Sequence, residues 1–570
     1  MAASRLPSAR WLRRPEHAAA IGCLLALAGL ASFSLCLLPP DGTWSGDTGI
    51  RVLQVETLLR QGDFAVPYLG QAADPTNRWN PLAPRYFAWQ GERYYPKFSP
   101  AYALLVAGVV ALGGLRAAAL PALLALALAA AALGGMLRLA GSRAGWVAAL
   151  AVILASPLVF YANELWEHEL AVALALVGML LLVATAWSSS WWLPLGAGGA
   201  FGVGLWFRAE LYAALPAILV AALVARLPRR SLVLALIATL LAALPLFGWQ
   251  QALYGRAEGA QVALDSPLVL RGAAPVVIAQ RLLRQWGDTI PSLVVPQGPL
   301  LLWLLAAGLI VGGAFTRRRH RWGHGLLMAG LVLAAVLAIA NLAFRLAPVD
   351  VVASCPLVLG GLTVSWRALE ERRQLLFRVL ALSALSYVVL ALFTAPSPGG
   401  AQHGPRYLLL SYPLLIGCTV LAGERWLACS PSWRRTATLA TLGVLAAASL
   451  AVQLAGLRNL LVIREQYAMV ARVSAALPPG PLVTDLWWYP QVVPAEVLRR
   501  PVFLVRDGND LAMLADRLAE QGTAQVTLVT SAEQPRWPLP DRTMGGRALR
   551  AAPPKAIAPR QLQFQSVTID

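Results

Sequence analysis

Repeated apolar runs of about 20 residues are the feature that most constrains this chain. A helix of about 20 apolar residues is long enough to cross the hydrocarbon core of a bilayer. The chain has 570 residues, of which 58% are hydrophobic and 13% charged, whereas soluble domains carry about 25% charged residues. The sequence therefore predicts a polytopic α-helical membrane protein with about 13 transmembrane helices. The predicted spans are 18–38, 99–137, 144–160, 166–187, 192–207, 211–225, 231–249, 298–315, 325–344, 351–366, 375–395, 407–423 and 436–456.

The positions of the arginines between these spans predict the topology. Arginine-rich loops stay on the cytoplasmic side of a membrane, and from Arg138 onward the strongly basic loops alternate with loops that are poor in arginine. This alternation predicts a cytoplasmic N-terminus and places everything after residue 456 outside. The same basic loops explain the net charge of +19, so the charge does not predict a nucleic-acid partner.

The N-terminal part of the chain raises two questions of topology. The span 18–38 follows a basic start and lacks a small-residue cleavage site, so it is predicted to remain as a signal anchor. The segment 99–137 is long enough for two helices, yet the alternation requires an odd number of crossings. Gly113-Gly114 and Pro121 predict a break there, into one full span and one partial or surface-lying piece.

Two large regions are predicted outside the membrane. The first external loop, 39–98, is expected to hold short helices at the membrane interface, with Val52 to Leu59 as an amphipathic piece. The segment 457–570 has strand-like runs at 482–488, 502–505 and 525–530 and a helical run at 510–521, followed by a stretch around Pro553-Pro554 that we expect to be irregular. The sequence thus predicts a transmembrane domain over 1–456 and a small extracytoplasmic α/β domain over 457–570.

Charged residues collect at the external ends of the predicted spans. Ionisable residues in such positions are costly and are therefore candidates for function. Carboxylates and cations together suit a reaction in which a carboxylate deprotonates an acceptor hydroxyl while cations neutralise a phosphate leaving group. The candidates are Asp47 and Lys97 in the first loop, Glu167, His168 and Glu169 in the second, Arg208 in the third and Arg406 in a later loop.

Structural roles are the alternative for each candidate. Asp47 could cap a helix that begins near Thr48, and Lys97 could extend to lipid headgroups. Arg208 could form a structural ion pair with Glu210. The glutamate-rich second loop could be a solvated turn.

Four short motifs at these residues resemble the integral membrane glycosyltransferases of the GT-C fold, which include the protein O-mannosyltransferases and the lipid A aminoarabinose transferases. The resemblance implies a GT-C-like arrangement of the spans over about residues 17–425. The motifs are Gly-Asp-x-Gly at 46–49, Pro-Lys-Phe-x-Pro at 96–100, Gly-Leu-x-x-Arg at 204–208 and Gly-Pro-Arg-Tyr at 404–407.

The resemblance also implies an activity. It implies a hexosyl- or pentosyltransferase of the bacterial inner membrane that moves a sugar, with inversion, from a polyprenyl-phosphate donor to a glycan, lipid or protein acceptor at the external face. Asp47 is implied to be the general base. Lys97, Arg208 and Arg406 are implied to contact the donor phosphate, and the second loop, with Glu167, His168 and Glu169, to contribute an acidic residue.

No cofactor is predicted with certainty. The first loop has neither an Asp-x-Asp nor an Asp-Glu pair, so a divalent metal stays open and unsupported, and no metal ligands are predicted.

Two other functions remain open at this stage. A lipid or sugar transporter (flippase) places ionisable residues near the bilayer midplane and often shows repeated halves, neither of which is evident here. A ligase or polymerase of lipid-linked glycans is expected to carry key arginines in a long late external loop. The loop 250–297, with Arg271, Arg281 and Arg284, keeps that alternative open.

Overall fold

The chain forms two compact units, which are described separately. In a computed structural model, the first unit comprises 1–34, 119–249 and 265–459, and the second comprises 35–118, 250–264 and 460–570. The structure describes residues 15–82, 86–257, 259–260, 264, 298–316, 320, 322–344, 350–362, 369–394, 403–429, 431–531, 537–557 and 562–570. Arg271, Arg281 and Arg284 lie outside the described residues.

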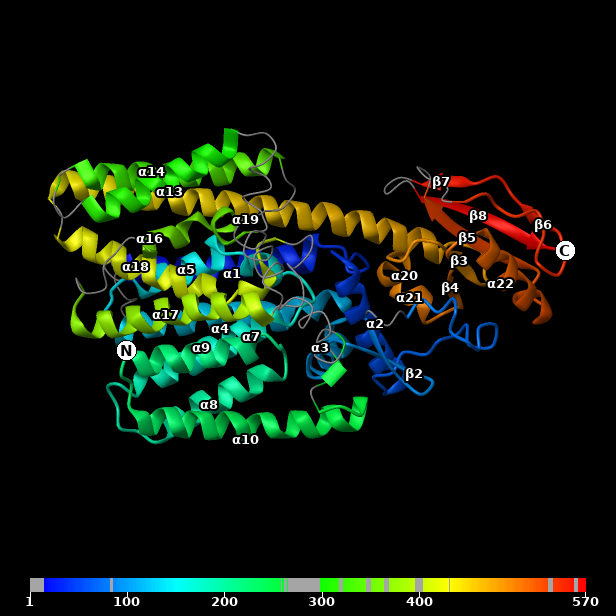
Figure 1. The fold of residues 1–570 in the computed structure, drawn as a ribbon, viewed down its shortest axis with the longest axis horizontal. Helices are drawn as coiled ribbons and strands as arrows, with labels where there is room; N and C mark the ends of the chain where they lie inside the picture. Colours follow the sequence, from blue (N-terminus) through cyan, green and yellow to red (C-terminus); the bar gives the residue numbers. More distant parts are fainter. Residues whose placement is uncertain are drawn as a thin grey trace, which may run out of the picture. The chain divides into compact units, whose positions relative to one another are not determined.

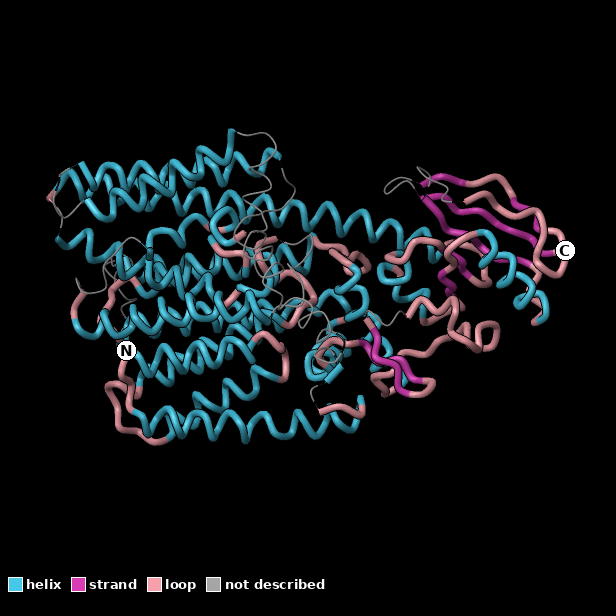
Figure 2. The backbone as a smooth tube through the Cα atoms, in the orientation of Figure 1, coloured by secondary structure: helices cyan, strands magenta, loops and turns pink. Residues whose placement is uncertain are grey.

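The first unit is built from helices (Figures 1 and 2). Its long helices pack in pairs, among them α13 with α14, α4 with α7, and α7 with α8. The helices are α1 (Pro15–Ser32), α4 (Leu120–Leu139), α5 (Gly145–Ala155), α6 (Leu158–Tyr161), α7 (His168–Ala184), α8 (Trp192–Leu205), α9 (Leu211–Val224), α10 (Arg229–Tyr254), α13 (Gly298–Thr316), α14 (Trp322–Phe344), α15 (Val351–Ser354), α16 (Leu359–Leu362), α17 (Glu371–Thr394), α18 (Ser411–Cys429) and α19 (Ser432–Ala475). The last residues of α10, after 249, and of α19, after 459, belong to the second unit.

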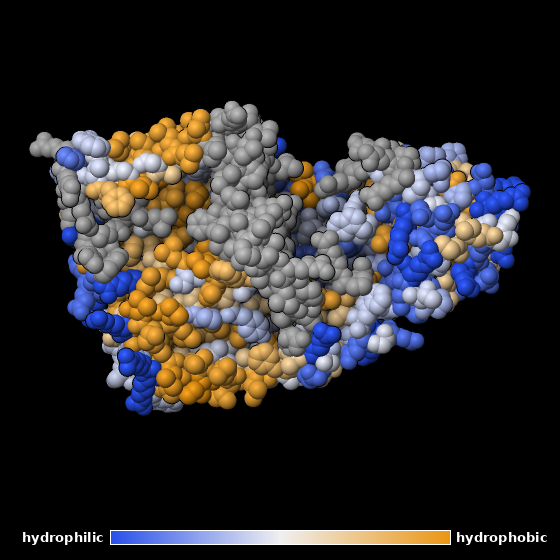
Figure 3. Space-filling model, viewed as in Figure 1, coloured by the Kyte–Doolittle hydropathy of each residue, from blue (hydrophilic) through white to orange (hydrophobic). Residues whose placement is uncertain are grey.

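Six of the described helical segments are long and apolar enough to cross a membrane. They are Ala18–Leu37, Leu115–Leu139, Arg229–Tyr254, Trp322–Leu342, Glu371–Ala391 and Ser432–Ala475. Six further apolar helices are shorter, and apolar residues cover much of the helical surface drawn in Figure 3. These features identify a multi-pass membrane protein, whereas the count of about 13 crossings stays a prediction.

The long apolar segment 99–137 is broken at Gly113-Gly114, where the sequence predicted a break. Helix α3 (Pro100–Gly113) ends at Gly114, whose φ of 68° lies in the left-handed region that favours glycine. A 3₁₀ turn, η3 (Leu115–Ala119), then leads into α4, with Pro121 in its first turn. The break therefore separates one full-length apolar helix from one of 14 residues.

Two other predicted spans differ from the structure. The run 351–366 is not one helix in its described part, because Pro356 cannot supply the backbone N–H of a continuing helix and starts the 3₁₀ turn η4 (Pro356–Val358) between α15 and α16. In contrast, the helix at the predicted span 436–456 does not end there but continues to Ala475 as α19, a helix of 44 residues. Its sequence contains no proline, so nothing in it forces a break at residue 456.

The first predicted external loop and the C-terminal segment form the core of the second unit. From the loop come helix α2 (Gly46–Gln61) and the hairpin of β1 (Phe87–Gln90) with β2 (Arg93–Pro96). Most side chains in the first three turns of α2 are buried. Helix α2 packs against the short helices α20 (Tyr489–Val492) and α21 (Pro494–Val497). Its first three turns are therefore buried by protein, whereas a position at the membrane interface stays a prediction.

The C-terminal segment contains a mixed sheet in the order β4–β3–β5–β8–β6, with β7 also paired to β8. β3 (Leu482–Thr484) is parallel to both β4 (Val502–Leu504) and β5 (Gln525–Ser531), and each of the three strands starts where a predicted run starts. Helix α22 (Gly508–Glu520) connects β4 to β5, and the side chain of Asp507 caps it by accepting from the N–H of Asp510 at 2.8 Å.

The end of the chain is not irregular, contrary to the prediction. It forms β6 (Leu549–Ala551), β7 (Lys555–Ile557) and β8 (Leu562–Ile569), and β8 pairs antiparallel with β5 along seven residues. The prolines 553 and 554 lie between β6 and β7, where no ladder hydrogen bond is needed. In β8, Leu562, Phe564, Val567 and Ile569 are buried among polar residues, which suits a strand with one face in the core.

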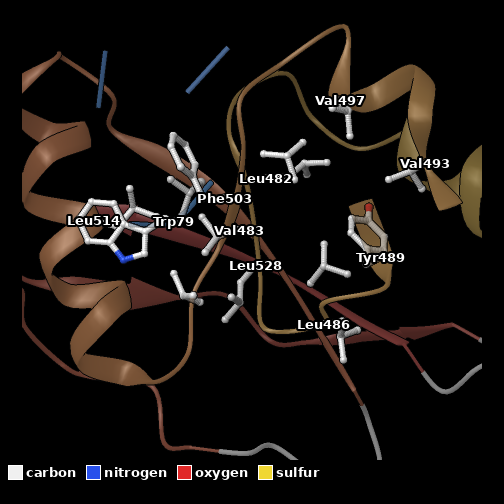
Figure 4. Close-up of a cluster of buried hydrophobic side chains, with 14 of the residues drawn as sticks. Trp79, Leu482, Val483, Leu486, Tyr489, Val493, Val497, Phe503, Leu514 and Leu528 are labelled. Carbon is white, nitrogen blue, oxygen red and sulfur yellow. The ribbon is translucent and has the colours of Figure 1, made fainter. Parts of the chain in front are cut away.

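One apolar core joins the sheet, α22 and the first predicted loop. Figure 4 shows the indole of Trp79, from that loop, among side chains of the C-terminal segment such as Phe503 and Leu514. The backbone joins in as well, since the N–H of Leu504 donates to the carbonyl of Trp79 at 2.8 Å. The compact units are therefore divided differently from the predicted domains 1–456 and 457–570, because the predicted loop 39–98 folds with the C-terminal segment.

Candidate functional site

The glutamate-rich turn of the first unit is buried. It connects α6 to α7, and the exposed fractions of Glu164, Glu167 and Glu169 are 0%, 0% and 1%. Asn163 stabilises the turn by donating from its amide to the carbonyl of Val159 at 2.7 Å. The alternative of a solvated turn is therefore excluded, and these carboxyl groups need partners or a function.

Arg208 supplies partners for this turn from the connection between α8 and α9. Its guanidinium donates to Glu167 at 2.7 Å and, through Nε, to Glu210 at 2.7 Å. A further contact joins Arg208 Nη2 to Glu210 Oε1. Burial alone would lower the pKa of Arg208, but the carboxylates of Glu210 and Glu167 hold it well above its ordinary value. Arg208 thus neutralises part of the charge of a buried acidic cluster.

His168 and Glu169 open helix α7. The imidazole of His168 lies against two aromatic rings, with centroids 5.5 Å from Tyr161 and 5.3 Å from Trp166. Neither carboxyl oxygen of Glu169 has a hydrogen-bond partner among the described residues. Glu169 lies close enough to Tyr161 for its charge to act on the phenol, as do Arg208 and Arg406.

Arg406 reaches the same aromatic group from the short helix η6 (Arg406–Leu408). Its guanidinium donates to the hydroxyl of Tyr407 at 2.9 Å and lies 4.8 Å from the centroid of that ring and 6.0 Å from Trp166. Tyr387 of α17 holds the loop by donating to the carbonyl of Tyr407 at 2.5 Å. In the first unit, the second-loop candidates, Arg208 and Arg406 therefore lie close to one aromatic cluster. The cluster consists of Tyr161, Trp166 and Tyr407.

His403 holds the chain that leads into Arg406. It stacks on Phe160, with ring centroids 5.2 Å apart, and its Nε2 lies 2.9 Å from Oε1 of Gln453. Because the amide of Gln453 donates to the carbonyl of Ser354 at 2.6 Å, its oxygen accepts from His403. Burial lowers the pKa of His403 to about 4, so the imidazole is neutral at physiological pH.

Asp47 belongs to the second unit, in the first turn of α2. The cap position is Ser45, so Asp47 does not cap this helix as the structural alternative supposed. A carboxylate in the first turn is favourable, because it faces the positive end of the helix dipole. Arg51, one turn later, donates from Nη1 to the backbone carbonyl of Asp47 at 2.9 Å.

Lys97 lies in the same unit, just after β2. Its N–H donates to the carbonyl of Tyr86 at 2.9 Å, and its ammonium lies 5.5 Å from the centroid of the Tyr86 ring. The next residue, Phe98, lies under the guanidinium of Arg51, which is 3.7 Å from the ring centroid. Arg51 therefore links the helix that carries Asp47 to the segment that carries Lys97.

Arg51 also belongs to this site, and the sequence analysis assigned it no role. Its exposed fraction is 2%, which is unusual for an arginine. The signal was available, because Arg51 follows Asp47 by four residues on a predicted helix and so lies on the same face.

The candidate residues fall into both units. Asp47 and Lys97 lie in the second unit, whereas Glu167, His168, Glu169, Arg208 and Arg406 lie in the first. Within the described parts of the chain, no three His, Cys, Asp or Glu side chains are placed to hold a metal ion.

The fold is similar to that of solved membrane enzymes. Over 91% of this chain and 69% of the other, it matches the oligosaccharyltransferase of Archaeoglobus fulgidus tethered with an acceptor peptide, with a TM-score of 0.50 and 13% identity. It also matches ArnT from Cupriavidus metallidurans over 97% of this chain and 98% of the other, at 13% identity, with TM-scores of 0.48 in the apo state and 0.45 bound to undecaprenyl phosphate.

No protein-family model and no curated protein matches the chain. At 13% identity, the similarity to the oligosaccharyltransferase is a similarity of fold. The protein has the GT-C fold of membrane glycosyltransferases, as its sequence motifs predicted.

Proposed function

We propose that this protein is a glycosyltransferase that moves a hexose or pentose from a polyprenyl-phosphate donor to a glycan, lipid or protein acceptor. The observation that carries the proposal is the burial of charged groups beside apolar helices, above all Glu167, Glu169 and Arg208. Burying a charge costs several kcal/mol, which an ion pair repays only in part, so such groups are retained for function more often than for stability. The GT-C fold and the four motifs support the same activity.

The proposed reaction is a single displacement at the anomeric carbon. The carboxylate of Asp47 accepts the proton of the acceptor hydroxyl as its oxygen attacks that carbon. The bond between the anomeric carbon and the phosphate oxygen breaks, and polyprenyl phosphate leaves with the bonding electrons. Because the attack comes from the face opposite the leaving group, the anomeric centre is inverted.

The cations are assigned to the phosphate. Lys97 and Arg406 offer N–H donors to its oxygens, and such donors stabilise the charge that develops as the phosphate leaves. Arg208 has five N–H donors, three of which contact Glu167 and Glu210, so it retains donors for a phosphate oxygen. The second loop contributes Glu167 and Glu169, with His168, as the acidic side of the site.

The proposal includes an orientation. The protein lies in the bacterial inner membrane with its N-terminus in the cytoplasm, with about 13 crossings. Residues 457–570 are extracytoplasmic and fold together with the first external loop. The sugar is transferred at the external face, where a polyprenyl-phosphate head group meets water while its chain stays in lipid. No metal or other cofactor is assigned to the reaction.

The function is tested by incubating the purified, detergent-solubilised protein with a panel of polyprenyl-phosphate sugars. Each donor is supplied with and without an extract of cell-envelope acceptors, and free polyprenyl phosphate is measured by mass spectrometry. We expect release from at least one donor that depends on the acceptor extract. Absence of release from every donor would contradict the proposal and favour a transporter or structural role.

A further inference from the structure

Asp47 is flanked by two glycines that touch the C-terminal segment within the second unit. A Cβ atom placed on Gly46 would lie 1.7 Å from the side-chain oxygen of Gln491, and one placed on Gly49 would lie 1.5 Å from the Gln491 backbone carbonyl. Real Cβ atoms essentially never come closer than 3.0 Å to such a neighbour. Only glycine fits at position 49, where the contact is with backbone, and an alanine at position 46 would displace the side-chain amide of Gln491. The Gly-Asp-x-Gly motif is therefore a docking surface for Gln491.

Gln491 cannot easily move away. It lies in α20 with an exposed fraction of 8%, and its side-chain amide donates to the carbonyl of Trp487 at 3.1 Å. Its neighbour Tyr489 is fully buried in the apolar core and forms a hydrogen bond of 2.7 Å with the hydroxyl of Ser474. The surface on which the two glycines rest is thus anchored in the core of the C-terminal sheet.

The other side of Asp47 is held by Arg51, which donates to its backbone carbonyl at 2.9 Å. The backbone of Asp47 is therefore fixed by Gln491 through the two glycines and by Arg51 one turn later. A general base must be held near the proton that it accepts, and a displacement of 1 Å can lower a rate about 100-fold.

We propose that the backbone of helix α20 at Gln491 positions Asp47 through the two glycines, so that the C-terminal segment sets the placement of the base rather than serving only as an accessory domain. This inference rests on the proposed role of Asp47. The two glycines differ in a useful way. The contact of Gly46 is with the far end of the Gln491 side chain, which a substitution can remove, whereas the contact of Gly49 is with backbone, which no side-chain substitution removes.

The test is a rescue experiment on the full-length protein, with polyprenyl phosphate release measured at several donor concentrations per amount of folded protein. We expect Gly46→Ala to lower kcat by about 10- to 100-fold, with a donor KM within about twofold of the wild type, because the cations that bind the phosphate do not move. Adding Gln491→Ala should restore most of this loss, since it leaves only the Gln491 Cβ at 3.2 Å. The loss in Gly49→Ala should not be restored by Gln491→Ala.

Gly108→Ala is the matched control, because Gly108 lies in a helix of the same unit and nothing lies within 4 Å of its added Cβ. If Gly46→Ala is not recovered as folded protein, Gln491→Phe takes its place, since a side chain larger than glutamine presses on Gly46 from the other side and the same fall in kcat is expected. Wild-type kcat in the variant used, or no rescue of Gly46→Ala by Gln491→Ala, would overturn the inference.

Asp47→Asn in the same assay separates the two proposals. If it is inactive while Gly46→Ala is fully active, the positioning role alone is wrong. If Asp47→Asn retains wild-type turnover, the proposed base is wrong and the positioning role falls with it.

Discussion

Arg208 and Glu167 form a buried ion pair of 2.7 Å across 41 residues of sequence, and their side chains are 4% and 0% exposed. The pair connects the turn before α7 to the turn before α9. Because Arg208 also contacts Glu210, it is the centre of a three-residue network. Arg208 therefore has structural partners and also N–H donors that remain for a ligand. Its role in stabilising the fold and its proposed role in binding the donor phosphate can be separated by experiment.

We expect Arg208→Ala to lower the free energy of unfolding by about 3–5 kcal/mol, because removal of one partner of a buried pair leaves the other charge uncompensated. Glu167→Gln should cost less, since Arg208 keeps Glu210. The measurement is the thermal stability of the detergent-solubilised variants, together with the donor KM. Unchanged stability of Arg208→Ala with a raised KM would show that the ion pair contributes nothing to the fold.

Arg51 provides a second prediction. Arg51→Met keeps the apolar stem but loses the bond to the Asp47 carbonyl and the contact with Phe98. Hydrogen bonds from charged groups contribute about 1.5–3 kcal/mol, so we expect a stability loss of that size and a fall in kcat of about tenfold or more. Both are measured in the release assay and by thermal unfolding.

Arg60→Met is the control for Arg51→Met. Arg60 lies on the same helix and pairs with Glu56, but its side chain is 53% exposed. Exposed pairs contribute about 0–1 kcal/mol, so stability and turnover should stay near those of the wild type. Equal losses in the two variants would mean that any arginine lost from α2 has the same effect.

His403 predicts a pH dependence of stability. Its pKa is about 4 in the folded protein and 6.5 ordinarily. Above pH 6.5 the imidazole is neutral in both states and has no effect. Between pH 6.5 and 4 the unfolded chain binds the proton that the folded chain does not, so stability falls by up to about 3 kcal/mol as the pH drops. Below pH 4 this contribution stays constant.

The variant that checks this is His403→Phe, which keeps the stacking on Phe160 but cannot titrate. Its absolute stability should be lower, because Gln453 loses its partner. The slope of the melting temperature against pH between 6.5 and 4 should be smaller than in the wild type. Identical slopes in the two proteins would contradict the account of His403.

Local sequence signals predicted much of this structure. The break after Gly113 was predicted because only glycine readily takes the backbone conformation that Gly114 adopts. The strands β3, β4 and β5 lie in runs with strong strand preference. The buried break at Pro356 was missed, because apolar length was given more weight than the proline.

Contacts between distant residues could not be predicted in this way. The pairing of β8 with β5 joins segments about 40 residues apart. The sequence that follows Pro553 and Pro554 contained no local signal for this pairing. The contact of Arg51 with Phe98 and the docking of Gly46 and Gly49 on Gln491 are likewise set by tertiary packing. The motif was visible in the sequence, but the reason for its glycines was not.

The central claim is that Asp47 is the general base of a sugar transfer, and Asp47→Asn tests it most directly. The amide keeps the shape of the side chain but cannot accept the proton, so we predict a fall in polyprenyl phosphate release of about 10²- to 10⁴-fold. The free energy of unfolding should fall by only about 0.3–1 kcal/mol, the contribution of the lost interaction with the helix dipole. Asp63→Asn, in the same loop and paired with Arg93 at the surface, should release polyprenyl phosphate at the wild-type rate. Near-wild-type release by Asp47→Asn would contradict the claim.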